Sequence, residues 1–224
     1  MIICISNVLM PDQIDEITTQ LKTAQFVDGN LTAGRFAKQV KQNLQLSSQS
    51  DEANQIKGAI AQALQRNPLL QIAARPKIIR PVLISRYEPG MTYGSHVDNA
   101  LMKNGQTSMR TDLSLTLFLS DPSTYEGGEL TIETHHGEES FKLDAGAMVL
   151  YPSSTLHRVE PVTQGIRLVA VSWIQSYIRD PNQREILFDL DTVKQSLFKR
   201  HGKSSEFDLL SKSVSNLLRL WADA

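Results

Sequence analysis

The sequence predicts a mainly β fold with flanking helices, an α+β protein whose strands form a sandwich or barrel. Three observations support this. Short apolar runs separated by glycine and proline fill residues 81–174, several of those runs alternate apolar and polar residues, and helical spacing of apolar residues appears only on either side of them. Many short strands with such punctuation are typical of a β-sandwich or barrel, and a jelly roll is one such fold.

The expected strands follow one another closely along the chain. They cover residues 81–87, 91–97, 113–119, 129–133, 147–151, 157–159 and 166–174, and the apolar opening around Cys4 adds another. Residues 113–119 read Leu-Ser-Leu-Thr-Leu-Phe-Leu, an alternation that buries one side of a strand. In the last strand the same period of two places four side chains on one face, namely Arg167, Val169, Val171 and Trp173.

Helices are expected before and after these strands. Two amphipathic stretches precede them, with apolar faces at Ile14, Ile17 and Leu21 and at Ile56, Ile60 and Leu64. The polar segment 29–50 between them is expected to be loop-rich and is a candidate mobile lid. We therefore predict one domain over residues 1–178, followed by a helical extension over residues 179–224.

The extension is predicted to contain two helices. Asp180 supplies an N-cap with Pro181 at the first helical position, and Gly202 ends the first helix. The second helix carries one apolar stripe, formed by Phe207, Leu210, Val214, Leu217, Leu218 and Trp221. Such a stripe predicts packing onto the barrel. A homo-oligomer contact through these C-terminal helices is the alternative.

Composition narrows the functional classes. The 23 basic and 24 acidic residues leave a net charge of −1, which provides no bulk field to recruit nucleic acid or an anionic membrane. The single cysteine excludes an intrachain disulfide and favours a reducing, cytoplasmic compartment, with Cys4 expected to serve packing. The first ten residues are apolar but lack a basic start, and Pro11 ends the run early, so neither a signal peptide nor a membrane span is expected.

Three residues form a candidate metal site. His96 and Asp98 are spaced i, i+2, so in a strand both side chains point to one face, and His157 would join them from a distant strand. Two imidazoles and one carboxylate are the facial set that binds Fe(II) and leaves positions open for other ligands. Arg167 lies ten residues later on an otherwise apolar strand. A buried arginine requires an anion nearby, so Arg167 is a candidate for binding a dianionic co-substrate.

The remaining histidines have structural interpretations. His135 and His136 would point to opposite faces of a strand, and the following Gly137 predicts a hairpin tip. His201 precedes Gly202 at the expected end of a helix, where a cation is favourable.

The chain resembles the Fe(II)- and 2-oxoglutarate-dependent dioxygenases, and more narrowly the bacterial PKHD-type hydroxylases of the prolyl 4-hydroxylase alpha-subunit superfamily. The matching residues include Arg86-Tyr87, His96-Val97-Asp98, Tyr125 to Leu130, Ala145-Gly146, Tyr151-Pro152, His157-Arg158-Val159, Arg167 and Gln175 to Asp180. The resemblance implies a double-stranded β-helix (jelly-roll) core. It makes His96, Asp98 and His157 the iron ligands, with Arg167 and Tyr87 binding 2-oxoglutarate.

The resemblance also implies a reaction. O₂ and 2-oxoglutarate are consumed, oxidative decarboxylation yields succinate, and an unidentified substrate is hydroxylated, with L-ascorbate as a candidate reductant and no catalytic residue beyond the metal centre. A link to iron uptake is expected from the related group. Collagen-type prolyl hydroxylases usually carry lysine where this chain has Arg167. The alternatives are a cupin-like metal enzyme, which would not need Arg167, and a non-catalytic metal- or ligand-binding sensor.

Overall fold

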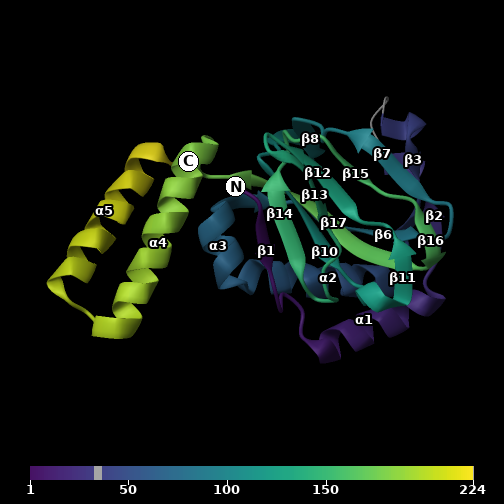
Figure 1. Ribbon diagram of the computed structural model, residues 1–224, viewed down its shortest axis with the longest axis horizontal. Coiled ribbons are helices and arrows are strands. Elements are labelled where there is room, and N and C mark those ends of the chain that lie inside the picture. Colours follow the sequence, from purple (N-terminus) through teal and green to yellow (C-terminus); the bar gives the residue numbers. More distant parts are fainter. Residues whose placement is uncertain (33–36, 224) are drawn as a thin grey trace.

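The computed structural model describes residues 1–32 and 37–223, which form two antiparallel sheets with helices against the outer face of the larger one (Figure 1). The larger sheet has the order β1-β14-β10-β17-β6-β4-β2, with β5 also paired to β17. Its strands are β1 (Ile3–Ile5), β2 (Phe26–Asp28), β4 (Leu44–Leu46), β5 (Pro76–Ile79), β6 (Leu83–Tyr87), β10 (Leu113–Phe118), β14 (Met148–Pro152) and β17 (Arg167–Ser176).

The smaller sheet has the order β13-β12-β15-β7-β3. Its strands are β3 (Lys41–Gln42), β7 (Thr92–His96), β12 (Leu130–Thr134), β13 (Gly137–Phe141) and β15 (His157–Val159). Two further pairs lie outside both sheets, β8 (Leu101–Asn104) with β9 (Thr107–Arg110) and β11 (Tyr125–Gly127) with β16 (Val162–Gly165). The predicted mainly β jelly roll with flanking helices is confirmed.

Strand alternation divides the protein into two apolar cores. On β10, Leu113, Leu115 and Leu117 face the helices, while Phe118 belongs to the cluster between the sheets. The helices on this side are α1 (Pro11–Thr23), α2 (Asp51–Arg66) and α3 (Pro68–Ala74). The start of each helix is marked by an N-capping side chain, by a proline in the first turn, or by both. The Ser50 hydroxyl caps α2 and the Asn67 side chain caps α3, while Pro11 and Pro68 occupy the first turns of α1 and α3.

The segment 29–50, expected to be loop-rich and a candidate lid, contains two short strands within its described part. Its strands β3 and β4 extend both sheets, with Lys41 opposite Tyr93 and Leu44 opposite Arg86. Residues 33–36, which also belong to that expectation, lie outside the described part of the chain. The polarity of this segment did not indicate solvent exposure, because Lys41, Asn43 and Gln45 line a cavity.

The C-terminal extension consists of α4 (Pro181–His201) and α5 (Ser205–Trp221), which lie side by side and project away from the sheets (Figure 1). The apolar stripe of α5 packs on α4 around Leu187 and Val214 and forms a separate core. Its predicted packing onto the barrel is therefore wrong. The helix α4 contacts α3 and is held there by an ion pair between Arg75 and Asp191. Ala222 and Asp223, which follow α5, contact the main body at Ile178, Lys77 and Arg110.

Two smaller expectations can be compared with the structure. Cys4 is exposed on β1 rather than packed, so its expected structural role is wrong. Among the described helices, none combines the length and apolar character needed to cross a membrane.

Candidate active site

The three candidate ligands converge where β7 meets β15. His96 is the last residue of β7 and pairs in register with His157, the first residue of β15. One donor atom from each of His96, Asp98 and His157 lies within 4.8 Å of the other two. Asp98 lies two residues beyond the end of β7, and its carboxylate lies beside both imidazoles, so the expected convergence of His96 and Asp98 is present. Among the described residues this is the only such cluster of histidine, cysteine and carboxylate side chains.

Backbone carbonyls orient both imidazoles. The Nδ1 atom of His96 lies 2.9 Å from the Gly94 oxygen, and Nδ1 of His157 lies 3.1 Å from the Thr155 oxygen. A carbonyl can only accept, so Nδ1 carries the proton in each ring and Nε2 keeps its lone pair. The His157 Nε2 atom is 3.8 Å from a carboxylate oxygen of Asp98. This pattern of donation to a carbonyl is the usual outer support of a metal-binding histidine.

A serine pair orients the carboxylate, and sequence reasoning missed it. The Ser114 hydroxyl donates to Asp98 at 2.6 Å and lies 2.7 Å from the Ser153 hydroxyl. Both serines are buried. Ser114 stands at a polar position of the alternating strand β10, and that alternation was the available signal that its side chain faces the interior of the jelly roll.

Burial keeps the first imidazole neutral. It lowers the pKa of His96 to about 4, and the neighbouring His157 adds to the effect. Tyr93 stacks on the His96 ring with centroids 3.6 Å apart, which shields that ring from water. A neutral imidazole is the form that ligates a metal, so His96 is ready to bind without first losing a proton at neutral pH.

Arg167 is fully buried, and its positive charge has no ion-pair partner among the described residues. Its side chain is 1% exposed, and none of its three guanidinium nitrogens has a hydrogen-bond partner among the described residues. The guanidinium carbon lies 5.0 Å from the ring centre of Tyr87 and 5.6 Å from that of Phe118. Burial lowers the pKa of Arg167, but arginine still carries its charge. An arginine held in this state requires an anion that the chain itself does not provide.

The surroundings of Arg167 leave room for such an anion. A Cβ atom on Gly128 would lie 2.9 Å from Cδ of Arg167, and the φ of Gly128 is +68°, so only glycine suits this position. The Tyr125 hydroxyl is buried near the guanidinium but outside hydrogen-bond geometry. Tyr87 pairs in register with Arg167 across β6 and β17, and burial raises the pKa of its phenol, which therefore stays protonated and can donate.

Asn43 is a second polar side chain that the sequence analysis missed. It is 4% exposed, and both its amide oxygen and its amide nitrogen are buried without a hydrogen-bond partner of good geometry. The amide is near enough to Tyr87 to favour the ionised phenol, although burial has the larger effect on that pKa. The sequence offered little indication that Asn43 is buried, because a polar residue within a polar segment is usually found at the surface.

One cavity of about 480 Å³ joins these groups. It is lined by the three candidate ligands, by Arg167, Tyr87 and Asn43, and by the predicted inward face of β17. Residues Val169, Val171 and Trp173 of that face all reach it, which confirms the alternation inferred from the sequence. The other histidines lie where expected, His135 and His136 in the turn between β12 and β13 and His201 at the end of α4. The cavity therefore combines a candidate metal site with an anion site.

Comparisons with known proteins agree with this geometry. Residues 82–175 match the 2OG-Fe(II) oxygenase superfamily, and residues 182–223 match the PKHD-type hydroxylase C-terminal domain. The fold and the matched region define a 2OG-Fe(II) oxygenase. A PKHD-type hydroxylase of a Synechococcus species is 56% identical over 223 residues, 100% of both chains, and one of a Picosynechococcus species is 57% identical over 219 residues, 98% of both. The chain belongs to the PKHD-type hydroxylases and is a 2-oxoglutarate-dependent hydroxylase.

Solved structures show the same fold at low identity. A prolyl hydroxylase from Trichoplax adhaerens, in complex with a peptide fragment of hypoxia inducible factor, matches with a TM-score of 0.56 at 15% identity over 78% of this chain and 83% of the other. HygX from Streptomyces hygroscopicus, with nickel and 2-oxoglutarate bound, matches with a TM-score of 0.56 at 11% identity over 78% and 82%. These likenesses concern the jelly roll alone.

Proposed function

We propose that His96, Asp98 and His157 hold Fe(II) and that Arg167 and Tyr87 bind the far carboxylate of 2-oxoglutarate. In this reaction, oxidative decarboxylation of 2-oxoglutarate to succinate is coupled to hydroxylation of a substrate. The observation that carries the proposal is the buried guanidinium without a partner, which lines the same cavity as the His-Asp-His cluster. The buried amide of Asn43, beside Tyr87, supplies a further group for the co-substrate or for water bound with it.

The chain's own residues orient the reactants and exclude water. Fe(II) held by His96, Asp98 and His157 would supply the redox chemistry, and three protein ligands would leave room for the co-substrate and O₂. Arg167 offers a planar fork that fits a carboxylate through two hydrogen bonds, and Tyr87 adds a neutral donor. Aromatic and aliphatic walls surround that carboxylate and keep the dielectric low, which strengthens the pairing.

The two alternatives explain less of the cavity. A cupin-like metal enzyme requires the His-Asp-His cluster but gives no reason for the unpaired Arg167. A metal- or ligand-binding sensor has no need of ligand positions left open beside an anion site. Three finer elements complete the proposal. L-ascorbate as a reductant and a link to iron uptake rest on family resemblance alone, and the cytoplasm is favoured by the single cysteine.

An anaerobic titration tests the proposed site. Fe(II) added to the purified protein is expected to bind at one equivalent, and 2-oxoglutarate is then expected to produce a weak visible charge-transfer band. Succinate offers no 2-oxo group for chelation and serves as the matched control that should give no band. If 2-oxoglutarate binds without changing the visible spectrum of the iron-loaded protein, it does not reach the metal, and the proposed chemistry is wrong.

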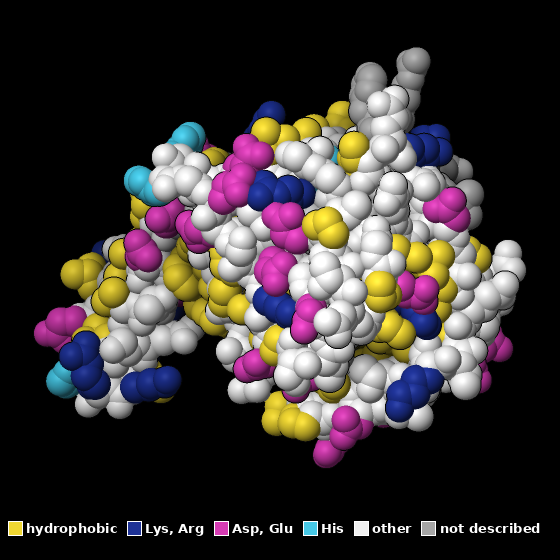
Figure 2. Space-filling model, turned by 45° about the vertical axis from the view of Figure 1, so that its right-hand side comes forward, with side chains coloured by type: hydrophobic (Ala, Val, Ile, Leu, Met, Phe, Trp, Pro, Cys, Tyr) yellow, Lys and Arg dark blue, Asp and Glu magenta, His cyan; other side chains and the backbone are white. Residues whose placement is uncertain are grey.

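We also propose that residues 179–224 form a separate unit through which the protein self-associates. Apolar side chains are visible on the surface of the helix pair (Figure 2). Ile186 and Val193 on α4 and Leu209 and Leu220 on α5 are 46–76% exposed. The spacings of seven and eleven residues keep each pair on one helix face. Sedimentation is expected to show a dimer or larger species for the natural chain and a monomer for Leu209→Glu/Leu220→Glu. A natural chain that stays monomeric at high micromolar concentration contradicts the proposal.

A further inference from the structure

The cavity extends well beyond the proposed co-substrate pocket. Arg167 and Trp173 lie six residues apart on the same face of β17, which separates their Cα atoms by roughly 20 Å at about 3.3 Å per residue. Trp173 pairs in register with Ser114, the serine that holds Asp98. The candidate metal ligands therefore lie toward the Trp173 end, and the space around Trp173 is left for a primary substrate.

Two cationic residues, Arg80 and Lys103, lie at the Trp173 end of the cavity. The Arg80 backbone N–H donates to the Trp173 carbonyl at 2.9 Å, and the Arg80 guanidinium donates to the backbone oxygen of Lys103 on the β8–β9 hairpin. Both residues line the cavity. Within the described part of the chain, neither Arg80 nor Lys103 forms an ion pair. Outside the cavity, Arg75, Arg86, Arg110 and Arg158 pair with carboxylates, whereas Arg184 donates to backbone carbonyls.

The lining as a whole is strongly positive. The described residues around the cavity include four lysines or arginines and one carboxylate, that of Asp98, which leaves an excess of three positive charges. Fe(II) and the 2-oxoglutarate dianion cancel one another and do not change this excess. Lys41 is one of the four, buried with its ammonium 5.3 Å from the ring centre of Tyr93, and Asp28 outside the cavity offsets part of its charge. With Fe(II) and 2-oxoglutarate bound, the cavity keeps its positive excess, so it attracts anionic substrates and disfavours cationic ones.

Apolar surface adjoins the two outer cations. Leu101 on the hairpin is 67% exposed and Val97 is 50% exposed, and both line the cavity with Met102 and Trp173. Building on the function proposed above, we propose that the primary substrate carries a carboxylate that Arg80 and Lys103 bind, beside an apolar segment that packs on Trp173 and Leu101. The carboxylate belongs either to a free organic acid or to an acidic side chain of a peptide.

Trp173 provides a direct reporter of this site. The chain has two tryptophans, so Trp221→Phe leaves Trp173 alone, and Trp221 lies in the separate helix-pair core. The protein is loaded with Ni(II), which does not turn over, and with saturating 2-oxoglutarate, which occupies Arg167. The Trp173 indole N–H resonance is then followed by NMR as 4-phenylbutyrate or its uncharged amide, 4-phenylbutyramide, is added. The acid is expected to bind about tenfold more tightly than the amide.

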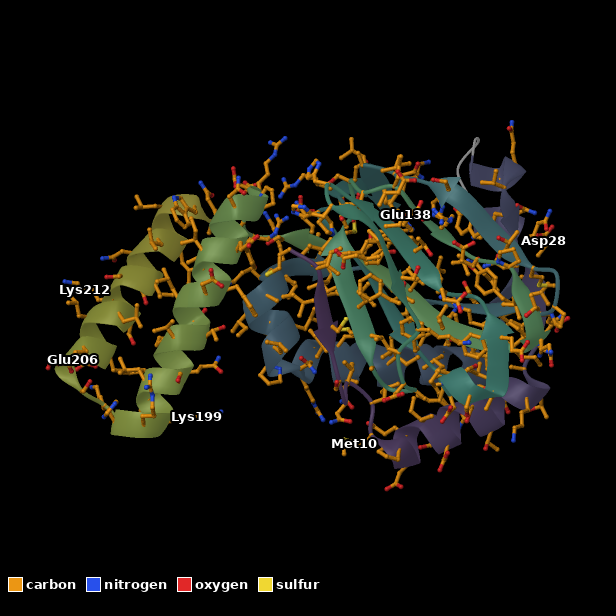
Figure 3. The ribbon with its side chains drawn as sticks, viewed as in Figure 1. Met10, Asp28, Glu138, Lys199, Glu206 and Lys212 are labelled. Atoms are coloured by element: carbon orange, nitrogen blue, oxygen red, sulfur yellow. The ribbon has the colours of Figure 1, made fainter. Side chains whose placement is uncertain are left out.

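Matched variants test whether Arg80 and Lys103 cause the preference for the acid over the amide. Arg80→Gln/Lys103→Gln is expected to remove the preference for the acid while leaving 2-oxoglutarate binding unchanged. Lys199→Gln/Lys212→Gln removes two cations from the helix pair (Figure 3) and is expected to keep it. A second pair of probes, acetyl-Ala-Glu-Phe-amide and its glutamine counterpart, distinguishes the sources. A preference for the glutamate peptide alone assigns the carboxylate to a peptide side chain, and a preference for phenylbutyrate alone assigns it to a free acid.

Two results would overturn the inference. One is equal binding of the charged and uncharged member of both probe pairs, and the other is a preference that survives Arg80→Gln/Lys103→Gln. The co-substrate is titrated first in the same samples. Absence of 2-oxoglutarate binding contradicts the proposed function, whereas normal 2-oxoglutarate binding without a preference for the acid contradicts only the assignment of the substrate class.

Discussion

His157→Ala is expected to weaken Fe(II) binding by more than about 100-fold and to abolish iron-dependent turnover of 2-oxoglutarate. Loss of a residue that merely supports a ligand costs roughly 10–100-fold, and removing a ligand should cost more. The fold should survive, because His157 lines a cavity and its backbone pairs with β7 and β12 irrespective of the side chain. Anaerobic Fe(II) titration measures the loss, and thermal melting monitors the fold.

His136→Ala is the matched control, because His136 is exposed in the turn between β12 and β13, away from the candidate ligands. It should bind iron as the natural protein does. Alanine variants of His96 and Asp98 should behave like His157→Ala. Stoichiometric iron binding that survives all three single substitutions would sink the metal-site assignment.

Arg167→Ala is expected to lower the affinity for 2-oxoglutarate by about 10²–10³-fold. The reason is that the co-substrate would have to bury a carboxylate without its cation, and breaking a buried charge pair costs about 3–5 kcal/mol. Iron affinity should change far less, because Arg167 is not among the candidate metal ligands. The charge-transfer band measured against 2-oxoglutarate concentration gives the affinity directly.

Arg158→Ala is the control for a lost guanidinium. Arg158 lies next to His157 in the chain, but it bonds Glu138 and Glu160 at 2.7 Å and does not line the cavity. Its removal should leave 2-oxoglutarate affinity unchanged. Normal affinity in Arg167→Ala would mean that another residue binds the co-substrate or that the co-substrate is a different molecule.

Tyr87→Phe is expected to have a smaller effect in the same titration. It keeps the ring 5.0 Å from the Arg167 guanidinium and removes only the hydroxyl. One hydrogen bond to a charged acceptor contributes about 1.5–3 kcal/mol, which corresponds to roughly ten- to a hundredfold in affinity. Unchanged 2-oxoglutarate binding, together with lower thermal stability in Tyr87→Ala, would assign Tyr87 to packing alone.

Alternation and helix signals made much of the fold predictable. The alternation in residues 113–119 correctly predicted strand β10, and the period of two in residues 166–174 correctly placed Arg167, Val169, Val171 and Trp173 on one face, which lines the cavity. Asp180, Pro181 and Gly202 mark the bounds of α4 as expected. These features succeeded because they depend on neighbours a few residues apart along the chain.

The features that sequence reasoning missed depend on distant partners. Ser114 orients a carboxylate 16 residues earlier, and Asn43 reaches the cavity because β4 joins the sheet beside β6. The stripe of α5 has the same periodicity whether it covers a barrel or another helix. Only the tertiary structure distinguishes these cases, since pattern and composition are identical in both.

Hydrogen bonds join the residues that precede the β8–β9 hairpin to those that follow it. Asp98 precedes the hairpin and Ser114 follows it, and they are hydrogen-bonded, while the Thr111 hydroxyl and backbone N–H bond the carbonyls of Asn99 and Ala100. These hydrogen bonds hold the Asp98 carboxylate in place irrespective of the residues between them. We therefore expect insertions or substitutions in the hairpin to change what enters the cavity while the position of the Asp98 carboxylate stays the same.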